Sequence, residues 1–120
     1  MYINTYIIPI AAEQKGAYLA LAEIFADIAK EYGALEIFEN WEVDIPDGQQ
    51  TDYRRAVAAT NDEKIIVSWV IWPDRESADV AHKNIFSDRR LAHIKSMPFD
   101  GKRMILGGFE PMLAWRRDQD

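Results

Sequence analysis

Glu39 is a carboxylate on the apolar face of a predicted strand, and this position makes it the strongest candidate for chemistry in the chain. The segment from Leu35 to Ile45 alternates apolar and polar side chains as a half-buried strand does, and Glu39 falls among the apolar members. A buried carboxylate must find a cation, become protonated or reach water in a cavity. We predict that Glu39 is a general base or a polar anchor in a pocket. The alternatives are a structural ion pair with Arg103 or Arg55 and a solvent-exposed place at the strand end.

His82 lies on the apolar stripe of a predicted helix, between Ala78 and Ile85. An imidazole there can transfer a proton or bind a metal or haem. The other histidine, His93, is eleven residues away, and neither has a partner at a ligand spacing. We therefore expect no bound metal and no cofactor. His82 joins Glu39 as a candidate catalytic residue, and the alternative is a structural histidine at the edge of the core.

Two tryptophans and two glycines are candidates for ligand binding. Trp41 and Trp69 would line an aromatic pocket, or else pack in the core or in an interface. Gly107 and Gly108 fall inside a predicted strand, where glycine costs roughly 0.5–1 kcal/mol relative to alanine. They indicate either a bulge or a backbone that a ligand or a second subunit approaches closely.

Asp100 and Arg103 complete the candidate ligand-binding residues. The run from Pro98 to Gly101 has the composition of a turn, and Lys102 and Arg103 place two cations beside it. These cations and the turn amides would form an anion site. The alternative is that Asp100 pairs with Arg103 and the segment only fixes the last strand.

The composition excludes several classes of protein. The chain has 120 residues and no cysteine, so it has neither disulfides nor a thiolate nucleophile. Its formal net charge of −6 argues against nucleic acid and anionic membranes as partners. The longest apolar stretch, Ile65 to Trp72, is far shorter than the roughly 20 residues of a membrane-spanning helix. No signal peptide is evident at the N-terminus, and we expect a cytoplasmic protein.

The elements that must position these residues follow from hydrophobic periodicity. We expect strands at 2–10, 35–45, 65–72 and 103–115, with a weak additional strand at 54–60. A helix at 13–32 ends at Gly33, Asp74 caps a second helix, and a short helix follows through residue 94. Residues 1–115 form one domain, and residues 116–120 form a solvated tail.

This order predicts an α+β, ferredoxin-like β-α-β-β-α-β fold, with an antiparallel sheet and both helices on one face. The strand from Ile65 to Trp72 is apolar on both faces, so something must cover the second face of the sheet. We expect a homodimer in which two sheets pair into a dimeric α/β barrel. The alternative is that long loops fold over the open face.

Several motifs resemble one known family. They are Gly33-Ala34-Leu35-Glu36, Ser68-Trp69, and the C-terminal block from Met97 to Ile105 that continues into Gly107-Gly108-Phe109-Glu110. From Tyr2 to about Trp115 the chain resembles the YbaA-like domain-of-unknown-function family. The resemblance implies a dimeric α/β barrel, related by fold to antibiotic-biosynthesis-type monooxygenases, chlorite-dismutase-like haem proteins and stress-responsive barrel proteins. It implies no particular reaction.

We therefore expect a cytoplasmic homodimer that binds a small, partly aromatic metabolite. One alternative is a cofactor-free monooxygenase- or isomerase-like enzyme in which Glu39 or His82 moves a proton. Another is a non-enzymatic, stress-associated assembly protein. The sequence leaves open whether the protein is an enzyme.

Overall fold

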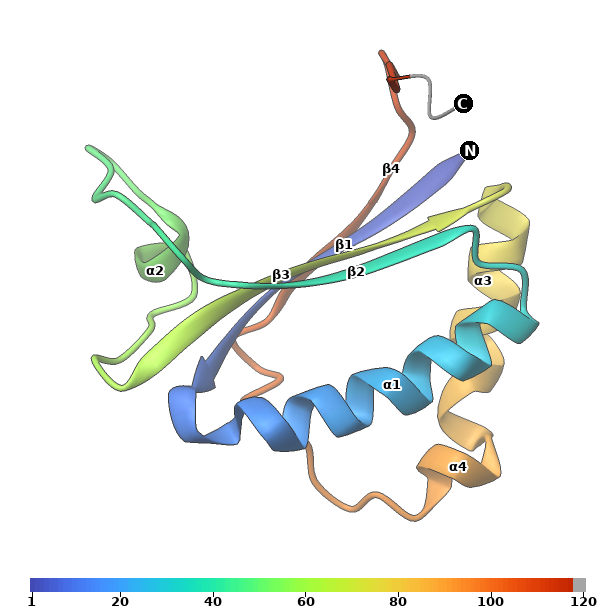
Figure 1. Ribbon diagram of the computed structural model, residues 1–120, viewed down its shortest axis with the longest axis horizontal. Helices are drawn as coiled ribbons and strands as arrows, with labels where there is room; N and C mark the ends of the chain where they lie inside the picture. The colour runs from blue at the N-terminus through green and yellow to red at the C-terminus, as the bar shows by residue number, and fades with distance from the viewer. Residues whose placement is uncertain (118–120) are drawn as a thin grey trace.

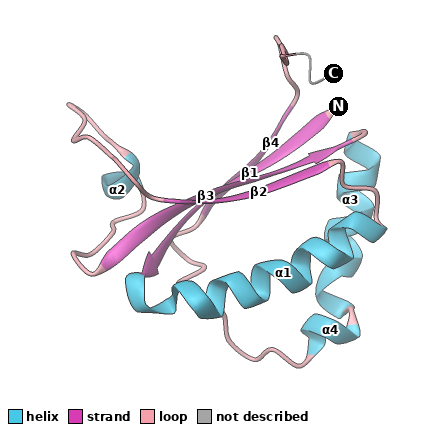
Figure 2. Ribbon diagram, in the orientation of Figure 1, coloured by secondary structure: helices cyan, strands magenta, loops and turns pink. Residues whose placement is uncertain are grey.

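The protein is a four-stranded antiparallel sheet with three helices packed on one of its faces (Figures 1 and 2). The computed structural model describes residues 1–117. The strands are β1 (Tyr2–Ala11), β2 (Glu36–Trp41), β3 (Glu63–Trp72) and β4 (Ile105–Phe109), in the order β2-β3-β1-β4. The helices are α1 (Lys15–Glu31), α2 (Tyr53–Ala56), α3 (Arg75–Asn84) and α4 (Arg89–Ala92), with 3₁₀ turns η1 (Ala12–Gln14) and η2 (Ile85–Ser87). The predicted α+β class and the β-α-β-β-α-β order of the main elements are confirmed.

Short polar residues and one glycine set the helix ends. The Asp74 side chain accepts a hydrogen bond from the Ser77 amide at 2.7 Å and caps α3 as predicted. Asp88 accepts from the Arg90 amide at 2.9 Å and caps α4. Gly33 follows α1 with a φ of 101°, a left-handed conformation that glycine adopts without a steric penalty.

Three predicted elements differ in the structure. The weak strand at 54–60 is wrong, because Asp52 accepts from the Arg55 amide and starts the helix α2 instead. The strand expected at 35–45 ends at Trp41, and the one expected at 103–115 covers only Ile105–Phe109. Trp115 therefore lies beyond the sheet. Of the predicted tail at 116–120, residues 118–120 lie outside the described residues.

The core fills the space between the sheet and the helices. Trp72, Ile10, Ile28 and Ile85 are completely buried there. The Trp72 indole donates a hydrogen bond from Nε1 to Oδ1 of Asn4 on the neighbouring strand, at 2.9 Å. Both side chains are buried, so this bond satisfies two polar groups that water cannot reach.

The opposite face of the sheet is largely apolar, and of the described helices only the short α2 lies on its side, near one end (Figure 1). Strand registers place on it Ile3, Ile7, Phe38, Val67, Trp69 and Phe109. Pro9 and Ile65 on this face are buried, whereas Phe38 and Phe109 remain 44% and 56% exposed, so the loops cover one end of the face and leave the rest open. We call this surface the open face.

The buried hydrogen bond between Asn4 and Trp72 gives the first prediction. Asn4→Leu leaves the indole N–H without a partner and should lower the free energy of unfolding by about 1–3 kcal/mol. Adding Trp72→Phe removes the unsatisfied donor, so the double variant should lose less than the two single losses added together. Urea denaturation measures this, and strict additivity would contradict the role of the bond.

Candidate functional site

A row of four side chains crosses the sheet on the face that the helices cover. The strand registers pair Glu39 of β2 with Ser68 of β3, Ser68 with Tyr6 of β1, and Tyr6 with Leu106 of β4. Neighbouring strands lie about 4.8 Å apart, so Glu39 and Tyr6 stand roughly 10 Å apart at the backbone. Tyr18 of α1 and His82 of α3 reach this row from the helix layer. Five polar side chains from five elements thus meet between the sheet and the helices.

These polar groups line a cavity of about 470 Å³ whose other walls are mostly apolar. The apolar lining comes from the sheet, from the helices and from the segment that precedes β4: Ile8, Leu21, Ala22, Phe25, Phe86, Leu91, Met97, Phe99, Met104 and Leu106. Phe86 and Leu106 are 58% and 63% exposed, which places the cavity mouth between the end of α3 and β4. Its size and lining are those of a small-molecule site.

Glu39 is held by a hydrogen bond from Tyr18 rather than by a cation. The Tyr18 hydroxyl donates to Oε2 of Glu39 at 2.6 Å, and within residues 1–117 Glu39 forms no ion pair. Burial raises the pKa of Glu39, and the hydrogen bond from Tyr18 partly offsets that rise. Burial and the Glu39 charge both raise the pKa of Tyr18, so its phenol stays a neutral donor.

Tyr6 and His82 form the second polar contact in the cavity. The Tyr6 hydroxyl lies 3.2 Å from Nε2 of His82. Burial, together with the negative charge of Glu39, raises the pKa of Tyr6 to about 12. Burial lowers the pKa of His82, and Asp79 partly offsets this. At neutral pH both groups are therefore uncharged, and Glu39 is the group that titrates toward an anion.

The cavity thus carries one potential negative charge and no positive one. No Lys or Arg belongs to its lining among the described residues. Neutral hydroxyl and imidazole groups supply hydrogen bonds, and a carboxyl with a raised pKa can take a proton from a bound molecule and return it. Within residues 1–117, no cluster of three His, Asp or Glu side chains is arranged to hold a metal ion.

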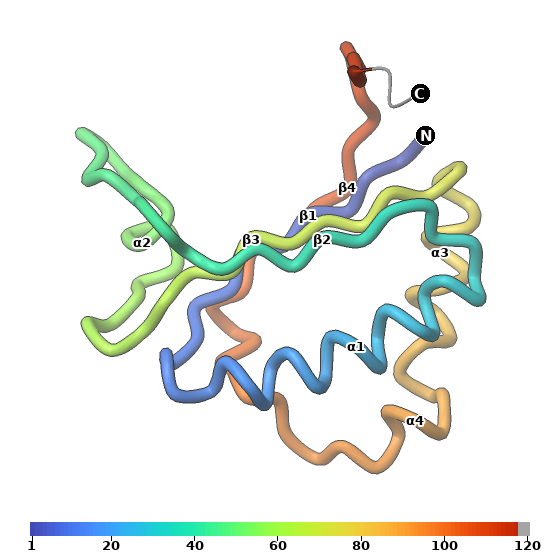
Figure 3. Tube along the Cα trace, viewed as in Figure 1, coloured from blue at the N-terminus to red at the C-terminus, as the bar shows by residue number. Residues whose placement is uncertain are grey.

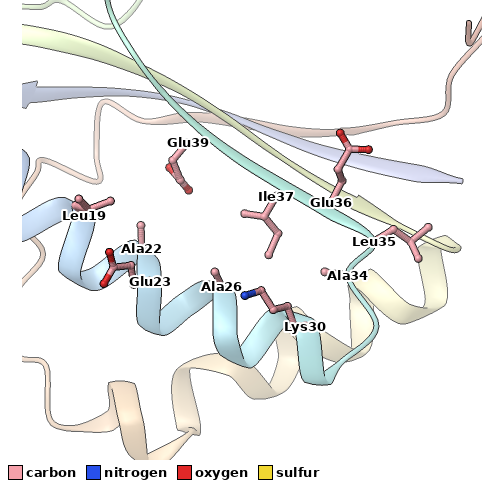
Figure 4. A pocket seen from close by; sticks show the side chains of 10 residues that line it. All are labelled: Leu19, Ala22, Glu23, Ala26, Lys30, Ala34, Leu35, Glu36, Ile37 and Glu39. Carbon is pink, nitrogen blue, oxygen red and sulfur yellow. The ribbon is translucent and has the colours of Figure 1, made fainter. Parts of the chain in front are cut away.

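Glu39 also faces a second hollow, a groove of about 320 Å³ between α1 and β2 (Figure 4). Figure 4 shows the Glu39 side chain pointing from β2 toward Ala22 on α1, while Glu36 points to the other side of the strand. Glu39 therefore keeps contact with solvent along the groove, although the protein around its carboxylate raises its pKa. Protons can reach this carboxylate by a route other than the cavity mouth.

The structure places both predicted catalytic candidates, Glu39 and His82, in this cavity. The alternative of an ion pair between Glu39 and Arg103 or Arg55 is wrong, whereas Glu39 is exposed to solvent, although within β2 and not at its end. Arg103 contacts Glu63 at 2.7 Å, and Arg55 contacts Asp52 at 2.9 Å.

The remaining ligand-binding candidates lie away from the cavity lining. Trp41 packs at the end of β2 with the Lys15 ammonium 4.8 Å from its ring centre. Trp69 lies on the open face and stacks on Phe38 at 5.3 Å. Asp100 pairs with Arg103 at 2.9 Å. The roles of these residues in ligand binding stay predictions.

Gly107 and Gly108 continue the ladder between β4 and β1 without a bulge. A Cβ on Gly108 would lie 1.7 Å from the Tyr2 hydroxyl, so it is a side chain of this chain that approaches the glycine closely. Neither glycine lines the cavity, and their role in ligand binding also stays a prediction.

Sequence reasoning missed Tyr6, Tyr18 and Ser68 as members of the site. Tyr18 lies on the apolar stripe of its helix, where the spacing is typical of a core residue. Tyr6 and Ser68 become neighbours of Glu39 only through the strand registers, which join segments about 30 residues apart or more. The signal in the sequence that could have identified Tyr6 and Ser68 is a polar side chain within an otherwise apolar strand.

The fold and the site together define a ferredoxin-like α+β protein with a cavity between its sheet and helices. Its structure is similar to that of an uncharacterised NIPSNAP domain protein from Burkholderia xenovorans, with a TM-score of 0.51 and 13% sequence identity. The match covers 98% of this chain and 100% of that one. At this identity the likeness concerns the fold alone. No helix in the described part of the chain is long and apolar enough to cross a membrane.

The sequence comparisons identify the family. Residues 1–101 match the family described as "Protein of unknown function (DUF1428)". The chain is 43% identical over 113 residues to the uncharacterised protein YbaA of Escherichia coli K12, covering 93% of this chain and 97% of YbaA. YbaA of Shigella flexneri gives the same values. The chain belongs to the DUF1428 family, and the predicted resemblance to YbaA-like proteins is confirmed.

The raised pKa of Glu39 predicts a pH dependence of stability. The folded state holds the proton more tightly than the unfolded chain, so the contribution of Glu39 to stability falls as pH rises from its ordinary pKa through the raised value. Glu39→Gln removes this effect. The free energy of unfolding of the wild type minus that of Glu39→Gln should therefore decrease as pH rises above the ordinary glutamate pKa of about 4.3. A flat or rising difference would contradict a desolvated Glu39.

Proposed function

We propose that this protein binds a small, mostly apolar molecule, neutral or positively charged, in the cavity between its sheet and helices. The observation that carries the proposal is the polar row of Glu39, Ser68 and Tyr6, which faces a mostly apolar cavity with no Lys or Arg among the described lining residues. A cavity used only for packing would be filled by side chains, since a void forfeits contacts.

Charge selects the class of ligand. An anionic ligand would meet the Glu39 carboxylate in a partly dehydrated space with no Arg or Lys to neutralise it. A hydroxyl or ammonium group can instead donate a hydrogen bond to Glu39. Tyr18 already orients that carboxylate through its 2.6 Å contact, which reduces the entropy lost on binding. The aromatic walls, with Phe25, Phe86 and Phe99, suit a planar body on such a ligand.

Three bicyclic aromatic probes that differ in charge test this proposal. We expect 1-naphthol and 1-naphthylmethylamine to raise the melting temperature, whereas 1-naphthoate should not. A ligand at tenfold its dissociation constant adds about 1.4 kcal/mol, which gives a shift of a few degrees. In Glu39→Gln the naphthoate should begin to raise the melting temperature, and the amine should no longer raise it more than the naphthoate does.

Glu23→Gln is the matched control, because Glu23 lines the groove but not the cavity and the variant has the same net charge as Glu39→Gln. In Glu23→Gln the three probes should shift the melting temperature in the same order as they do in the wild type. Equal stabilisation of the wild type by naphthoate and amine would overturn the proposed ligand class. The absence of any stabilisation by naphthol and amine would count against the binding function itself.

We further propose that the binding protein is a homodimer joined through the open face. Monomeric proteins rarely leave a contiguous apolar surface of this extent in water, and this one spans all four strands. An isologous pairing of two open faces would bury Val67 and Trp69 of each copy between two sheets about 10 Å apart. In such a dimer each copy would cover the open face of the other, and each would keep its own cavity on the helix-covered face.

Val67→Glu tests the pairing, since it would place two carboxylates between the sheets. We expect light scattering to give twice 13.8 kDa for the wild type at micromolar concentration and 13.8 kDa for Val67→Glu. Val80→Glu, on the exposed side of α3, is the matched control and should remain a dimer. A monomeric wild type, or a dimeric Val67→Glu, would contradict this interface.

A further inference from the structure

Two segments rise from opposite ends of the sheet on the side of its open face (Figure 3). The first, which we call the acidic segment, is residues 42–47 and follows β2. The second, which we call the C-terminal arm, is residues 110–117 and follows β4. The register places Glu36 and Phe109 in one cross-strand row, whereas Trp41 ends β2 five residues farther along the strand. The two segments are therefore separated by roughly 17 Å along the strand direction.

Both segments expose apolar side chains almost completely. Val43 of the acidic segment is 96% exposed, and in the arm Met112 and Leu113 are 102% and 88% exposed. Pro111 cannot donate to a strand ladder, which is consistent with the arm leaving the sheet after β4. Arg116 anchors the arm by a 2.8 Å contact with Glu36 on the open face of β2. The arm thus crosses the end of the open face while its apolar side chains stay in water.

The two segments differ in the charges that they carry. The acidic segment contains Glu42, Asp44 and Asp47 and no Lys or Arg, and Glu42 is already paired with Arg54. The arm ends in Arg116 and Arg117, and the Arg117 guanidinium lies 5.1 Å from the ring centre of Trp115. The arm also contains Glu110, and Asp118 and Asp120 follow it in the sequence, so its positive charge is confined to the two arginines. Both segments have exposed apolar side chains beside their charges.

We propose that in the homodimer the C-terminal arm of each copy docks on the acidic segment of the other copy. This inference rests on the dimer proposed above and specifies its orientation. Two sheets that pair with aligned strands have two arrangements with a two-fold axis. An axis across the strands brings each arm to the partner's acidic segment, whereas an axis along the strands brings arm to arm and acidic segment to acidic segment. Repulsion between the two acidic segments disfavours the second arrangement.

The docking would also bury the exposed apolar side chains of the two segments, which pairing of the open faces alone would leave in water. Leu113 and Trp115 would cover Val43 of the partner, while Arg117 would approach Asp44. Each contact occurs twice in a two-fold dimer, so its contribution to the dissociation constant is doubled in free energy. The arms then act as clamps at both ends of the paired sheets.

Cysteine cross-linking distinguishes the two arrangements, because the natural chain contains no cysteine. We expect a short bis-maleimide to link a mixture of Val43→Cys and Leu113→Cys full-length chains into a covalent heterodimer. Each variant alone should give little covalent product. Self-linking of Leu113→Cys alone, or no linking in the mixture, would overturn the inference.

Charge reversal tests the electrostatic part of the contact. Asp44→Lys/Asp47→Lys should weaken the dimer about tenfold or more, and so should Arg116→Glu/Arg117→Glu. The quadruple variant should return to within about threefold of the wild type. It also lacks the internal pair of Arg116 with Glu36, so recovery would report the contact between copies. Asp27→Lys/Asp79→Lys on the helix layer is the control and should change little.

These outcomes separate the two proposals. A monomeric wild type in sedimentation equilibrium would overturn the homodimer and the docking together. A dimer that Val67→Glu disrupts, but whose dissociation constant does not respond to charge reversal or does not recover in the quadruple variant, would overturn the docking and leave the open-face homodimer standing.

Discussion

The hydrogen bond from Tyr18 to Glu39 is the interaction on which the chemistry of this fold depends. It places a carboxylate that has no cationic partner within residues 1–117 against a cavity of about 470 Å³, in surroundings that raise its pKa. Glu39 is exposed to solvent along the groove, yet the protein around its carboxylate disfavours the charged form, so an apolar side chain would avoid this cost at a purely structural position. The strand registers fix the same arrangement, because they align Glu39, Ser68 and Tyr6 across three strands. A molecule in the cavity would meet one ionisable acid, two phenols and an imidazole.

The sheet has two faces with different tasks. The helix-covered face holds the cavity and its polar row, and the open face is the one through which we propose that two copies pair. Because successive residues of a strand point to opposite faces, the two tasks are encoded in alternate residues of the same strands. In β3, Ser68 faces the cavity while Val67 and Trp69 face the open side. A change in register by one residue would exchange the two sets and destroy both surfaces.

Much of the fold was predictable, because periodicity and helix caps are local signals. Helix α1 with its end at Gly33, the cap at Asp74 and the placement of Glu39 on the apolar face of β2 all follow from residues within one segment. The weak strand at 54–60 was wrong because its apolar residues were interpreted without the Asp52 cap. The partners of Glu39 could not be predicted in the same way. Tyr6, Tyr18 and Ser68 have ordinary positions in their own segments, and only the packing of distant elements gives them a common cavity.

The ionisation of Glu39 tests the central claim most directly. Carbon-13 NMR of the Glu39 side-chain carboxyl, followed through a pH titration in the wild type and in Tyr18→Phe, reports its pKa at the residue itself. The account predicts a pKa above the ordinary glutamate value in the wild type, and a still higher one in Tyr18→Phe, because the hydrogen bond stabilises the charged form. An ordinary pKa that does not respond to the loss of the Tyr18 hydroxyl would contradict it.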